Sequence, residues 1–199
     1  FKKTFYYLSD EEKDFLDLFL ERHGIAREEQ VVAIAPGGGE SSKRRMFTKR
    51  WPVQNYIELI QRLQRERSSR VILVGGPGDR EVTNSVIQVC PNCIDATDLS
   101  FGEMASIFRR CNLFLGNDSA PLHIAASMGI RCIGIFGPTD PQQWAPLNQN
   151  SSFVVKPVEC HPCLIDERFP KCSHIRCLTS ITVGDVWQQL ESTKPYVKI

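Results

Sequence analysis

A carboxylate, a hydroxyl and an imidazole lie within six positions of one another in the run from Gly116 to His123. The run follows an apolar, strand-like stretch and leads into a helix-like one, so Asp118, Ser119 and His123 lie where a helix is expected to begin. The first turn of a helix presents backbone N–H groups and the positive end of the helix dipole, which together favour a phosphate. The pattern predicts an anion site at the carboxyl end of a strand, where open α/β sheets bind nucleotides.

Asp118 and His123 also have purely structural interpretations. Asp is a good N-cap residue, so Asp118 could do no more than cap the helix. A lone histidine lies on a helix surface or in a core more often than in a functional site. His123, however, follows Ser119 by about one helical turn, which places it on the face nearest the start of the helix. An N-cap role would account for Asp118 but not for the whole group.

A cluster of positive charge follows another apolar stretch and its Pro-Gly-Gly-Gly sequence. Five cations occupy eight positions there, namely Lys43, Arg44, Arg45, Lys49 and Arg50. An isolated charge run is usually a solvated loop. At the end of a strand, however, Gly37 and Gly38 let the backbone approach a ligand closely, and a lysine beyond them supplies a point charge to a phosphate. The segment is neither a Walker loop nor a GxGxxG fingerprint.

A third glycine-rich turn, Gly75-Gly76-Pro77-Gly78, is followed by Asp79 and Glu81. On its own this turn predicts only a tight connection after a strand. A nicotinamide-dependent oxidoreductase would need a glycine fingerprint and an acidic residue about 20 positions further on, and no segment of the chain supplies that combination.

The elements that position these residues alternate between short apolar strands and amphipathic helices. We expect strands at 31–35, 71–74, near 94, and at 113–115, 132–136 and 153–155. We expect helices after the capping boxes Ser9–Glu12 and Ser100–Glu103, and at 53–66, 80–89, 119–128 and 183–190. We expect the stretch at 137–150 to be irregular and the one at 157–179 to be a long loop. Such alternation predicts an α/β fold, a Rossmann-like doubly wound parallel sheet covered on both faces.

Composition fits one soluble domain. The chain has 199 residues, 42% of them hydrophobic and 24% charged, with a net charge of +1. This balance gives no general attraction to nucleic acid or to a membrane. No apolar run reaches the roughly 20 residues that span a bilayer, and we expect no signal peptide. Because the chain starts with Phe1, we expect a domain of a longer protein.

Eight cysteines are many for an intracellular chain. Cys111 and Cys132 lie at the edges of apolar stretches, where a small buried hydrophobe is expected. Cys90 and Cys93 form a CxxC without neighbours that would activate a thiolate. The last four, Cys160, Cys163, Cys172 and Cys177, have the spacing C-x2-C-x8-C-x4-C, which permits a four-thiolate zinc site. Reduced thiols packed under the loop, or a disulfide formed in air, are the alternatives, and we expect no catalytic metal.

Together these runs resemble the bacterial heptosyltransferases, glycosyltransferases that build the lipopolysaccharide inner core from ADP-heptose. The resemblance extends from about residue 31 to 190. The pieces that carry it stand in order: Pro36-Gly37-Gly38, Lys49-Arg50-Trp51-Pro52, Gly75-Gly76-Pro77, Asn117-Asp118-Ser119-Ala120-Pro121-Leu122-His123 and Phe136-Gly137-Pro138-Thr139-Asp140-Pro141. The cysteine-rich segment from 160 to 177 also looks like one found in some members.

The resemblance implies that this chain is the carboxyl-terminal, donor-binding domain of a two-domain GT-B enzyme. Within it, 1–30 would be a leading helix and linker, 31–156 the Rossmann-like core, 157–180 a cysteine-rich loop packed beside that core, and 181–199 a helix and tail. The general base and the acceptor site would lie on an amino-terminal domain. A heptosyltransferase of this kind is inverting, needs no metal or other cofactor, and works at the cytoplasmic face of the inner membrane, with transient contact to that membrane.

The resemblance also assigns roles to residues. Lys49 would contact the diphosphate and neutralise the charge on the ADP leaving group, and Lys49 and Asp118 are the expected catalytic residues. The residues expected to hold the diphosphate at the start of the helix are Asp118, Ser119, the backbone at Ala120 and His123. Gly37, Gly38 and Lys49 are also expected to bind the donor. Asp79 or Glu81 would contact the nucleoside or sugar, and the backbone near Leu99 would border the adenine. Many members have Gly where Ala120 stands, so the diphosphate is expected to lie slightly differently here.

A nucleotide-binding module without catalysis is the alternative to a transferase, because the donor half of an enzyme and a pure binder share these features. A second Rossmann-like domain upstream of Phe1 would distinguish a transferase from such a module. Alone, the chain is expected to bind ADP-heptose or a similar ADP-sugar but not to transfer the sugar.

Overall fold

A computed structural model describes residues 4–38, 40–41, 44–45, 47–163, 172 and 174–192. Its centre is a six-stranded sheet of order β5-β4-β1-β6-β7-β8, parallel in every pairing. The strands are β1 (Val31–Ala35), β4 (Arg70–Gly75), β5 (Ile94–Thr97), β6 (Leu113–Asn117), β7 (Arg131–Phe136) and β8 (Ser151–Val155). The predicted doubly wound parallel sheet is confirmed.

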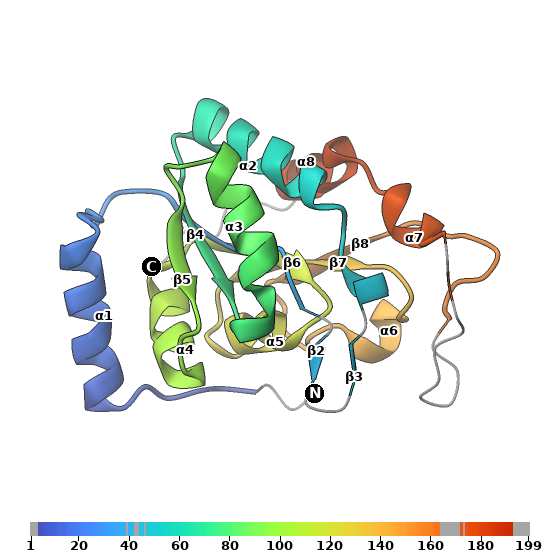
Figure 1. Cartoon of the computed structure of the whole chain (residues 1–199). Helices are drawn as coiled ribbons and strands as arrows, with labels where there is room; N and C mark the ends of the chain where they lie inside the picture. The colour runs from blue at the N-terminus through green and yellow to red at the C-terminus, as the bar shows by residue number, and fades with distance from the viewer. Residues whose placement is uncertain are drawn as a thin grey trace.

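Helices connect the strands and cover both faces of the sheet. They are α1 (Asp10–Arg22), α2 (Val53–Arg67), α3 (Arg80–Val89), α4 (Phe101–Arg110), α5 (Ala120–Ser127), α6 (Pro141–Trp144), α7 (Arg176–Thr179) and α8 (Val183–Ser192). Two 3-10 turns, η1 (Phe47–Lys49) and η2 (Pro77–Asp79), and a small hairpin of β2 (Glu40–Ser41) and β3 (Arg44–Arg45) complete the described elements. Figure 1 shows α2, α3 and α8 on one side of the sheet and α1, α4 and α5 on the other.

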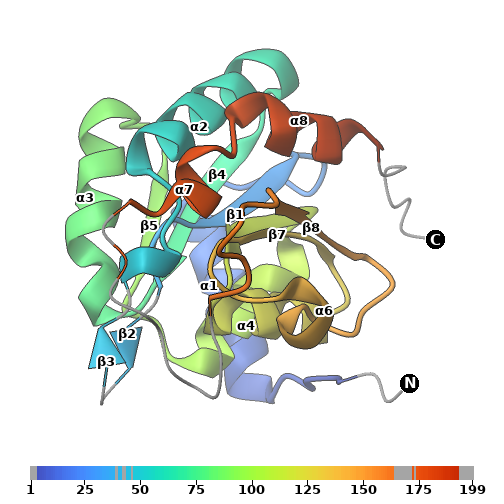
Figure 2. The same cartoon turned by 90° about the vertical axis from the view of Figure 1, so that its right-hand side faces the viewer.

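Side chains that alternate along each strand pack into two separate cores, one on each face of the sheet. Val32 and Ile34 of β1 pack with α2 and α8, whereas Val31, Ala33 and Ala35 pack with α4 and α5. The view of Figure 2 shows the same sandwich from the side, with α2 and α8 above the sheet and α1 and α4 below it. Because both faces are covered, the strands are apolar throughout, as the sequence pattern indicates.

Local signals account for the ends of most elements. Both predicted capping boxes form, Ser9 with Glu12 at α1 and Ser100 with Glu103 at α4. Gly24 and Gly129 follow α1 and α5 with φ of +57° and +75°, a backbone conformation that only glycine adopts without strain. The predicted helices and strands are confirmed to within a few residues.

The expectation of an irregular stretch at 137–150 and a plain loop at 157–179 was wrong in part. Asp140 caps the short helix α6 by accepting from Gln142 N, and Pro141 fits its first turn. The single turn α7 begins at Arg176. Helices of four residues leave too short a pattern to be predicted from sequence.

The chain changes direction across the sheet between β1 and β6. From β1 it runs outward to β4 and β5, then returns through α4 to β6 on the other side of β1. The loops that follow β1 and β6 therefore leave the sheet side by side and diverge. This is the point where open α/β sheets bind ligands.

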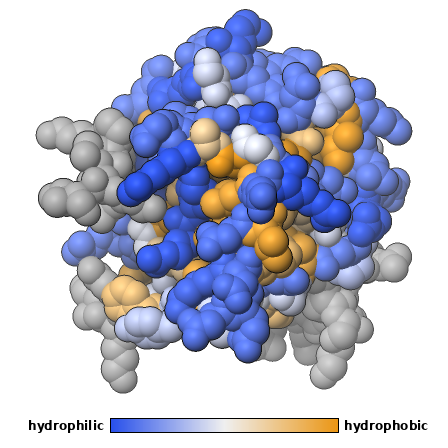
Figure 3. Space-filling view, turned by 90° about the vertical axis from the view of Figure 1, so that its left-hand side faces the viewer, coloured by the Kyte–Doolittle hydropathy of each residue, from blue (hydrophilic) through white to orange (hydrophobic). Residues whose placement is uncertain are grey.

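The surface on the side of α1 mixes polar and apolar groups. Figure 3 looks onto this side and shows hydrophobic residues near the middle, surrounded by hydrophilic ones. Leu18 of α1 and Phe101 at the start of α4 are exposed apolar side chains. In the part of the chain that the structure describes, no helix combines the length and hydrophobicity needed to cross a bilayer.

Candidate functional site

A buried amide ties together the loops after β1 and β6. The Asn117 side chain donates to the carbonyl oxygens of Pro36 and Gly37 at 3.1 and 2.8 Å. Its oxygen accepts from Trp51 N and from the Tyr56 hydroxyl, both at 2.9 Å. Burial raises the pKa of Tyr56 well above its ordinary value, so this hydroxyl remains a donor. Asn117 thus fixes the floor of a site that we call the switch-point site, formed by Gly37, Gly38, Lys49, Asp118 and Ser119.

Lys49 and Asp118 form an ion pair in this site. Lys49 ends η1 after β1, and Asp118 follows β6, yet their Nζ and Oδ2 atoms lie 2.6 Å apart. The buried Thr139 hydroxyl donates to the same Oδ2 at 2.8 Å. Both charged side chains are largely shielded, with 13% and 6% exposure. Residues 69 positions apart are therefore brought together, as the sequence predicts, but Asp118 holds a lysine and not the end of a helix.

The N-cap of α5 is Ser119 and not Asp118. Ser119 adopts an extended conformation, and its hydroxyl contacts the Asn117 carbonyl at 3.2 Å. Ala120 is the first, exposed residue of the helix, so the start of α5 opens toward the surface. Gly38 approaches this helix end closely, because a Cβ atom on Gly38 would lie 2.8 Å from Ser119 Cβ. The structure therefore places a glycine loop against a helix N-terminus.

Asp79 joins two glycine loops. Its carboxylate accepts from Gly38 N at 2.8 Å and from Gly76 N at 3.0 Å. Arg50 pairs with the same carboxylate at 2.9 Å and also donates to the Gly38 carbonyl at 2.8 Å. A side chain on Gly37 would collide with Asp79. Asp79 thus supports the backbone of the site, and its buried carboxylate is occupied by these donors.

The other two nucleoside candidates follow the neighbouring strands β4 and β5. Glu81 is exposed in the first turn of α3. Leu99 follows β5 and is half-buried against the core on the α4 face. Lys43 lies outside the described residues. Among the five cations after β1, the structure describes side-chain contacts with the site for Lys49 and Arg50.

His123 lies on α5, close enough to Asp118 and Lys49 to interact with both charges. The residue is exposed, but protein atoms around its ring exclude enough water to lower its pKa. The Asp118 carboxylate opposes this shift in the pKa, and the Lys49 ammonium adds to it. The ring is therefore neutral near pH 7 and can accept or donate one hydrogen bond at each nitrogen.

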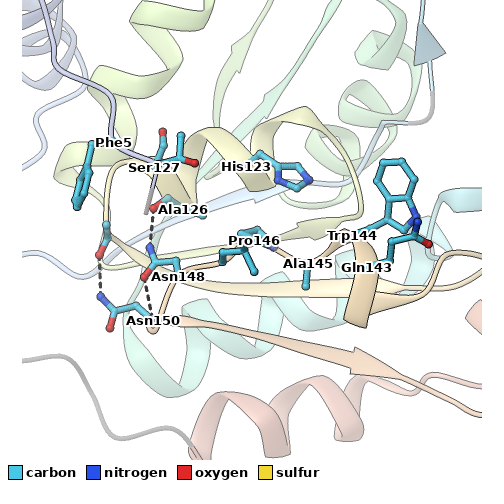
Figure 4. Close-up of a pocket in the computed structure, with 13 residues that line it drawn as sticks. Phe5, His123, Ala126, Ser127, Gln143, Trp144, Ala145, Pro146, Asn148 and Asn150 are labelled. Carbon is cyan, nitrogen blue, oxygen red and sulfur yellow. Dashed lines mark hydrogen bonds between the residues drawn. The ribbon is translucent and has the colours of Figure 1, made fainter. Parts of the chain in front are cut away.

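A hollow of about 450 Å³ runs beside α5 from His123 toward Gly129. Figure 4 shows His123 and Trp144 toward one end, and Asn148 and Asn150 at the other. The two asparagines donate to carbonyl oxygens of Ala126 and Gly129 at 2.6 and 3.0 Å, which anchors the loop before β8 to α5. His123 thus belongs both to this hollow and to the surroundings of the Lys49–Asp118 pair.

The cysteine segment packs against the same end of the sheet. Cys160, Cys163, Cys172 and Cys177 all line one small cavity, together with His174. Burial, together with charge on the other three thiols, raises the pKa of Cys163 to about 11. Burial likewise raises the pKa of Cys93, to about 12, so the separate Cys90–Cys93 pair holds no activated thiolate.

Arg50, Asn117 and Thr139 are site residues to which no role was assigned from the sequence. Arg50 was visible as one of five cations and, like Thr139, as part of a longer run. Asn117 carried one usable signal, a polar residue at the end of an apolar strand. Their partners are 12 to 81 positions away along the chain, so the contacts depend on the strand order.

Curated relatives of this chain are lipopolysaccharide and lipooligosaccharide heptosyltransferases. Lipooligosaccharide heptosyltransferase 2 of Campylobacter jejuni (strain 81116) is 25% identical over 81% of this chain and 51% of its own length. Lipopolysaccharide heptosyltransferase 3 of Escherichia coli is 33% identical over 66% of this chain and 37% of its own length. The chain spans about half the length of such relatives, or less.

Several solved structures share the fold of this chain. A family 9 glycosyltransferase from Veillonella parvula superposes with a TM-score of 0.78 at 21% identity, over 96% of this chain and 53% of that one. The E. coli heptosyltransferase WaaC, solved with ADP, gives 0.65 at 19% identity, over 89% and 48%. The dodecameric, iron-containing heptosyltransferase TibC, in complex with ADP-D-beta-D-heptose, gives 0.62 at 17% identity, over 83% and 45%.

The family model of glycosyltransferase family 9 (heptosyltransferase) matches residues 6–173, which include every residue of the switch-point site. The chain belongs to this family of glycosyltransferases.

Proposed function

We propose that this chain is the donor-binding half of a heptosyltransferase and binds ADP-heptose, or a similar ADP-sugar, at the switch-point site. The observation that carries the proposal is the Lys49 ammonium held 2.6 Å from Asp118, beside the N-terminus of α5, in a member of this family. A cation and backbone N–H groups at one point match the charge of a diphosphate. The relative solved with ADP supports the choice of nucleotide.

Lys49 and the start of α5 would serve the chemistry as a fixed set of positive charges. When the acceptor hydroxyl displaces ADP from the anomeric carbon, negative charge develops on the leaving diphosphate. Preorganised donors stabilise such charge without reorganisation at the moment of reaction. A single displacement inverts the anomeric configuration, and the donor set needs no metal to neutralise the leaving group. Lys49 and the N–H groups near Ser119 and Ala120 are the residues proposed for this role.

Asp118 would act on Lys49 and on the sugar, and not on the phosphates. A carboxylate only accepts hydrogen bonds and repels a diphosphate, whereas it accepts well from sugar hydroxyls. Thr139 and Lys49 both donate to one oxygen of Asp118, which keeps the carboxylate oriented. His123, one helical turn after Ser119, would add a hydrogen-bond donor near the diphosphate.

Glu81 is the better candidate of the two acidic residues for the nucleoside contact. Asp79 is buried and accepts from two backbone amides and Arg50, so it supports the loops. Glu81 is exposed at the start of α3 and can turn toward a ribose hydroxyl. The backbone near Leu99 would border the adenine, because it follows β5 on the same edge of the sheet.

The acceptor would be the lipopolysaccharide core, bound by the remainder of the full-length protein together with the general base. The whole enzyme would then work at the cytoplasmic face of the inner membrane. In that arrangement the isolated chain binds the donor and does not transfer the sugar.

Calorimetric titration of the chain with ADP, with and without magnesium, tests the proposal. We expect binding in both cases, weakened about tenfold or more by Lys49→Ala because a charge-assisted hydrogen bond contributes about 1.5–3 kcal/mol. Lys156→Ala is the matched control, since Lys156 forms a similar 2.7 Å ion pair with Asp185 beside α8. Binding that needs magnesium, or an equal loss in both variants, would count against the proposal.

A further inference from the structure

The hollow beside α5 extends beyond the part that the proposed donor site uses. From His123 it follows α5 past the end of that helix at Ser127, away from the helix start where the diphosphate is proposed to bind. Its volume of about 450 Å³ is that of a small-molecule site. Figure 4 shows His123 and Trp144 toward one end of the hollow and Asn148 and Asn150 at the other. The hollow is therefore large enough for a ligand beside the donor.

The lining of this hollow carries no charge. Among the described residues around it, none is an aspartate, glutamate, lysine or arginine, and His123 is neutral near pH 7 because desolvation of the ring lowers its pKa. Arginines line the two hollows at the amino-terminal edge of the sheet, Arg67 and Arg131 in one, Arg109 and Arg131 in the other. A phosphate or carboxylate would therefore meet no opposite charge beside α5. The hollow suits an uncharged ligand.

Three side chains at the His123 end of the hollow have hydrogen-bonding groups that no protein group uses. Within the part of the chain that the structure describes, neither the His123 ring, the Gln143 amide nor the Trp144 indole N–H forms a hydrogen bond. Trp144 is 40% exposed, and Phe5 and Leu147 add exposed apolar surface. A sugar ring matches this lining, because its C–H groups pack on an aromatic face while its hydroxyls bond to amides and imidazole. The lining thus favours a neutral saccharide.

The wall that carries Gln143 and Trp144 is fixed before a ligand arrives. The carbonyl of Asp140, at the start of α6, accepts from Gln143 N at 3.1 Å and from Trp144 N at 2.9 Å. Further along, Asn148 donates to the Ala126 carbonyl at 2.6 Å, which joins the wall to α5. A preformed site loses less conformational freedom on binding than one that must first be ordered.

We propose that this hollow is a saccharide subsite that takes a neutral sugar unit of the acceptor. The choice of occupant rests on the proposed function, because a transferase brings a saccharide acceptor next to its donor. The sugar of the donor is tied to the diphosphate at the start of α5, whereas the hollow leads from His123 along the flank of that helix. This half of the enzyme would thus contact the acceptor as well as the donor, alongside the remainder of the full-length protein.

Indole N–H signals of the isotopically labelled chain, followed by NMR during titration with methyl heptoside and without nucleotide, test the subsite. The indoles of Trp51 and Trp187 are buried and already hydrogen-bonded. We expect the Trp144 signal to move and the other two indole signals to stay. A Trp144 signal that stays in place up to the solubility limit of the sugar would overturn the proposal.

Two neighbouring glutamines give a matched pair of variants. Gln143 lines the hollow, whereas Gln142 is also exposed in the same helical turn but does not line it. Gln143→Ala should weaken binding of the sugar about threefold to tenfold, the effect of one lost hydrogen bond, and Gln142→Ala should leave it unchanged. The backbone amide of Ser127 reports binding in both variants, and circular dichroism shows whether both fold. Equal affinities in the two folded variants would overturn the proposal.

Kinetics of the full-length enzyme identify the acceptor as the source of the sugar. Trp144→Ala should raise KM for the acceptor about fivefold or more, as the loss of an aromatic contact does, and leave KM for ADP-heptose unchanged. A rise in KM for the donor instead, or no change in either value, would overturn the assignment to the acceptor. The titration with methyl heptoside contains no nucleotide, so a chain that binds ADP but not the sugar defeats this inference alone. A chain that binds the sugar but not ADP defeats the proposed donor site.

Discussion

At the scale of single residues, the switch-point site is organised by what each side chain can donate or accept. Lys49 supplies positive charge, Asp118 accepts, and Thr139 donates to Asp118 from a fully buried position. A buried, satisfied network of this kind is rigid, because breaking any member leaves a polar group without a partner. The network therefore holds Lys49 in place before a ligand arrives.

Asp118→Ala separates a role in donor recognition from a role in stability. We expect the affinity for ADP-heptose to fall about tenfold, the effect of one or two hydrogen bonds, and the affinity for ADP to fall less. Titrations with both ligands and a thermal melt on the same samples make the comparison. A lower melting temperature with unchanged affinity for either ligand would assign Asp118 to structure alone.

His123 predicts a pH dependence of donor binding. Its pKa in the free chain lies below 6.5, and a nearby diphosphate would raise it, so binding takes up a proton. Affinity should rise as the pH falls from about 8 toward 5.5. The free energy of unfolding should fall over the same pH change. The pKa of His123 is lower in the folded chain than in the unfolded one, so the unfolded chain takes up the proton first. The resulting stability is present above pH 6.5 and is lost as the pH falls through the pKa of the folded chain.

ADP-ribose suits this measurement, because its diphosphate is diesterified and does not titrate in that range. His123→Gln should flatten the pH profile of binding. His23→Gln is the control, since desolvation and neighbouring arginines also lower the pKa of His23, at the end of α1. An unchanged profile in His123→Gln would remove His123 from the site.

At the scale of elements, the site depends on how closely the loop after β1 approaches the start of α5. Gly38 has a φ of +99°, and a Cβ there would lie 2.8 Å from Ser119 Cβ. The left-handed backbone and the close approach both require glycine at this position. The loop and the helix end are thus fitted to each other around a glycine.

Gly38→Ala should therefore lower both the stability of the fold and the affinity for ADP. We expect a loss of roughly 1–2 kcal/mol in the free energy of unfolding from backbone strain alone, with a further shift of the loop away from Ser119. Gly76→Ala is the control, because Gly76 has a φ of −90° and a Cβ added there would meet no atom within 4 Å. Denaturant titrations of the two variants that coincide would show that the approach is not tight.

Sequence patterns predicted the regular elements well because their signals are local. Apolar runs, capping boxes and glycines after helices fix where α1, α4 and β1 begin and end. The contacts of Asn117 and Arg50 could not be predicted, since they exist only once β6 lies beside β1. The sequence could not tell which of Asp79 and Glu81 contacts the nucleoside. That depends on the burial of Asp79 against two glycine loops, which only the packing reveals.

At the scale of the whole molecule, the cavities lie at both ends of the strands. One hollow of about 520 Å³ lies at the amino-terminal edge of the sheet, lined by Asn112 and Arg131 among others. Size alone would favour it as a ligand site. Three features favour the opposite ends of the strands as the ligand site. These are the strand topology, the helix dipole of α5 and the Lys49–Asp118 pair, which all act at the carboxyl ends of β1 and β6.

Backbone amide shifts of the isotopically labelled chain, followed by NMR during titration with ADP, show whether ADP binds at the switch-point site. We expect the largest changes at Gly37, Gly38, Ser119 and Ala120, and small ones at Asn112 and Arg131. We also expect Lys49→Ala to abolish most of these changes at the same ADP concentration. Shifts concentrated at the amino-terminal edge, or the absence of shifts at millimolar ADP, would contradict the assignment of the switch-point site as the donor site.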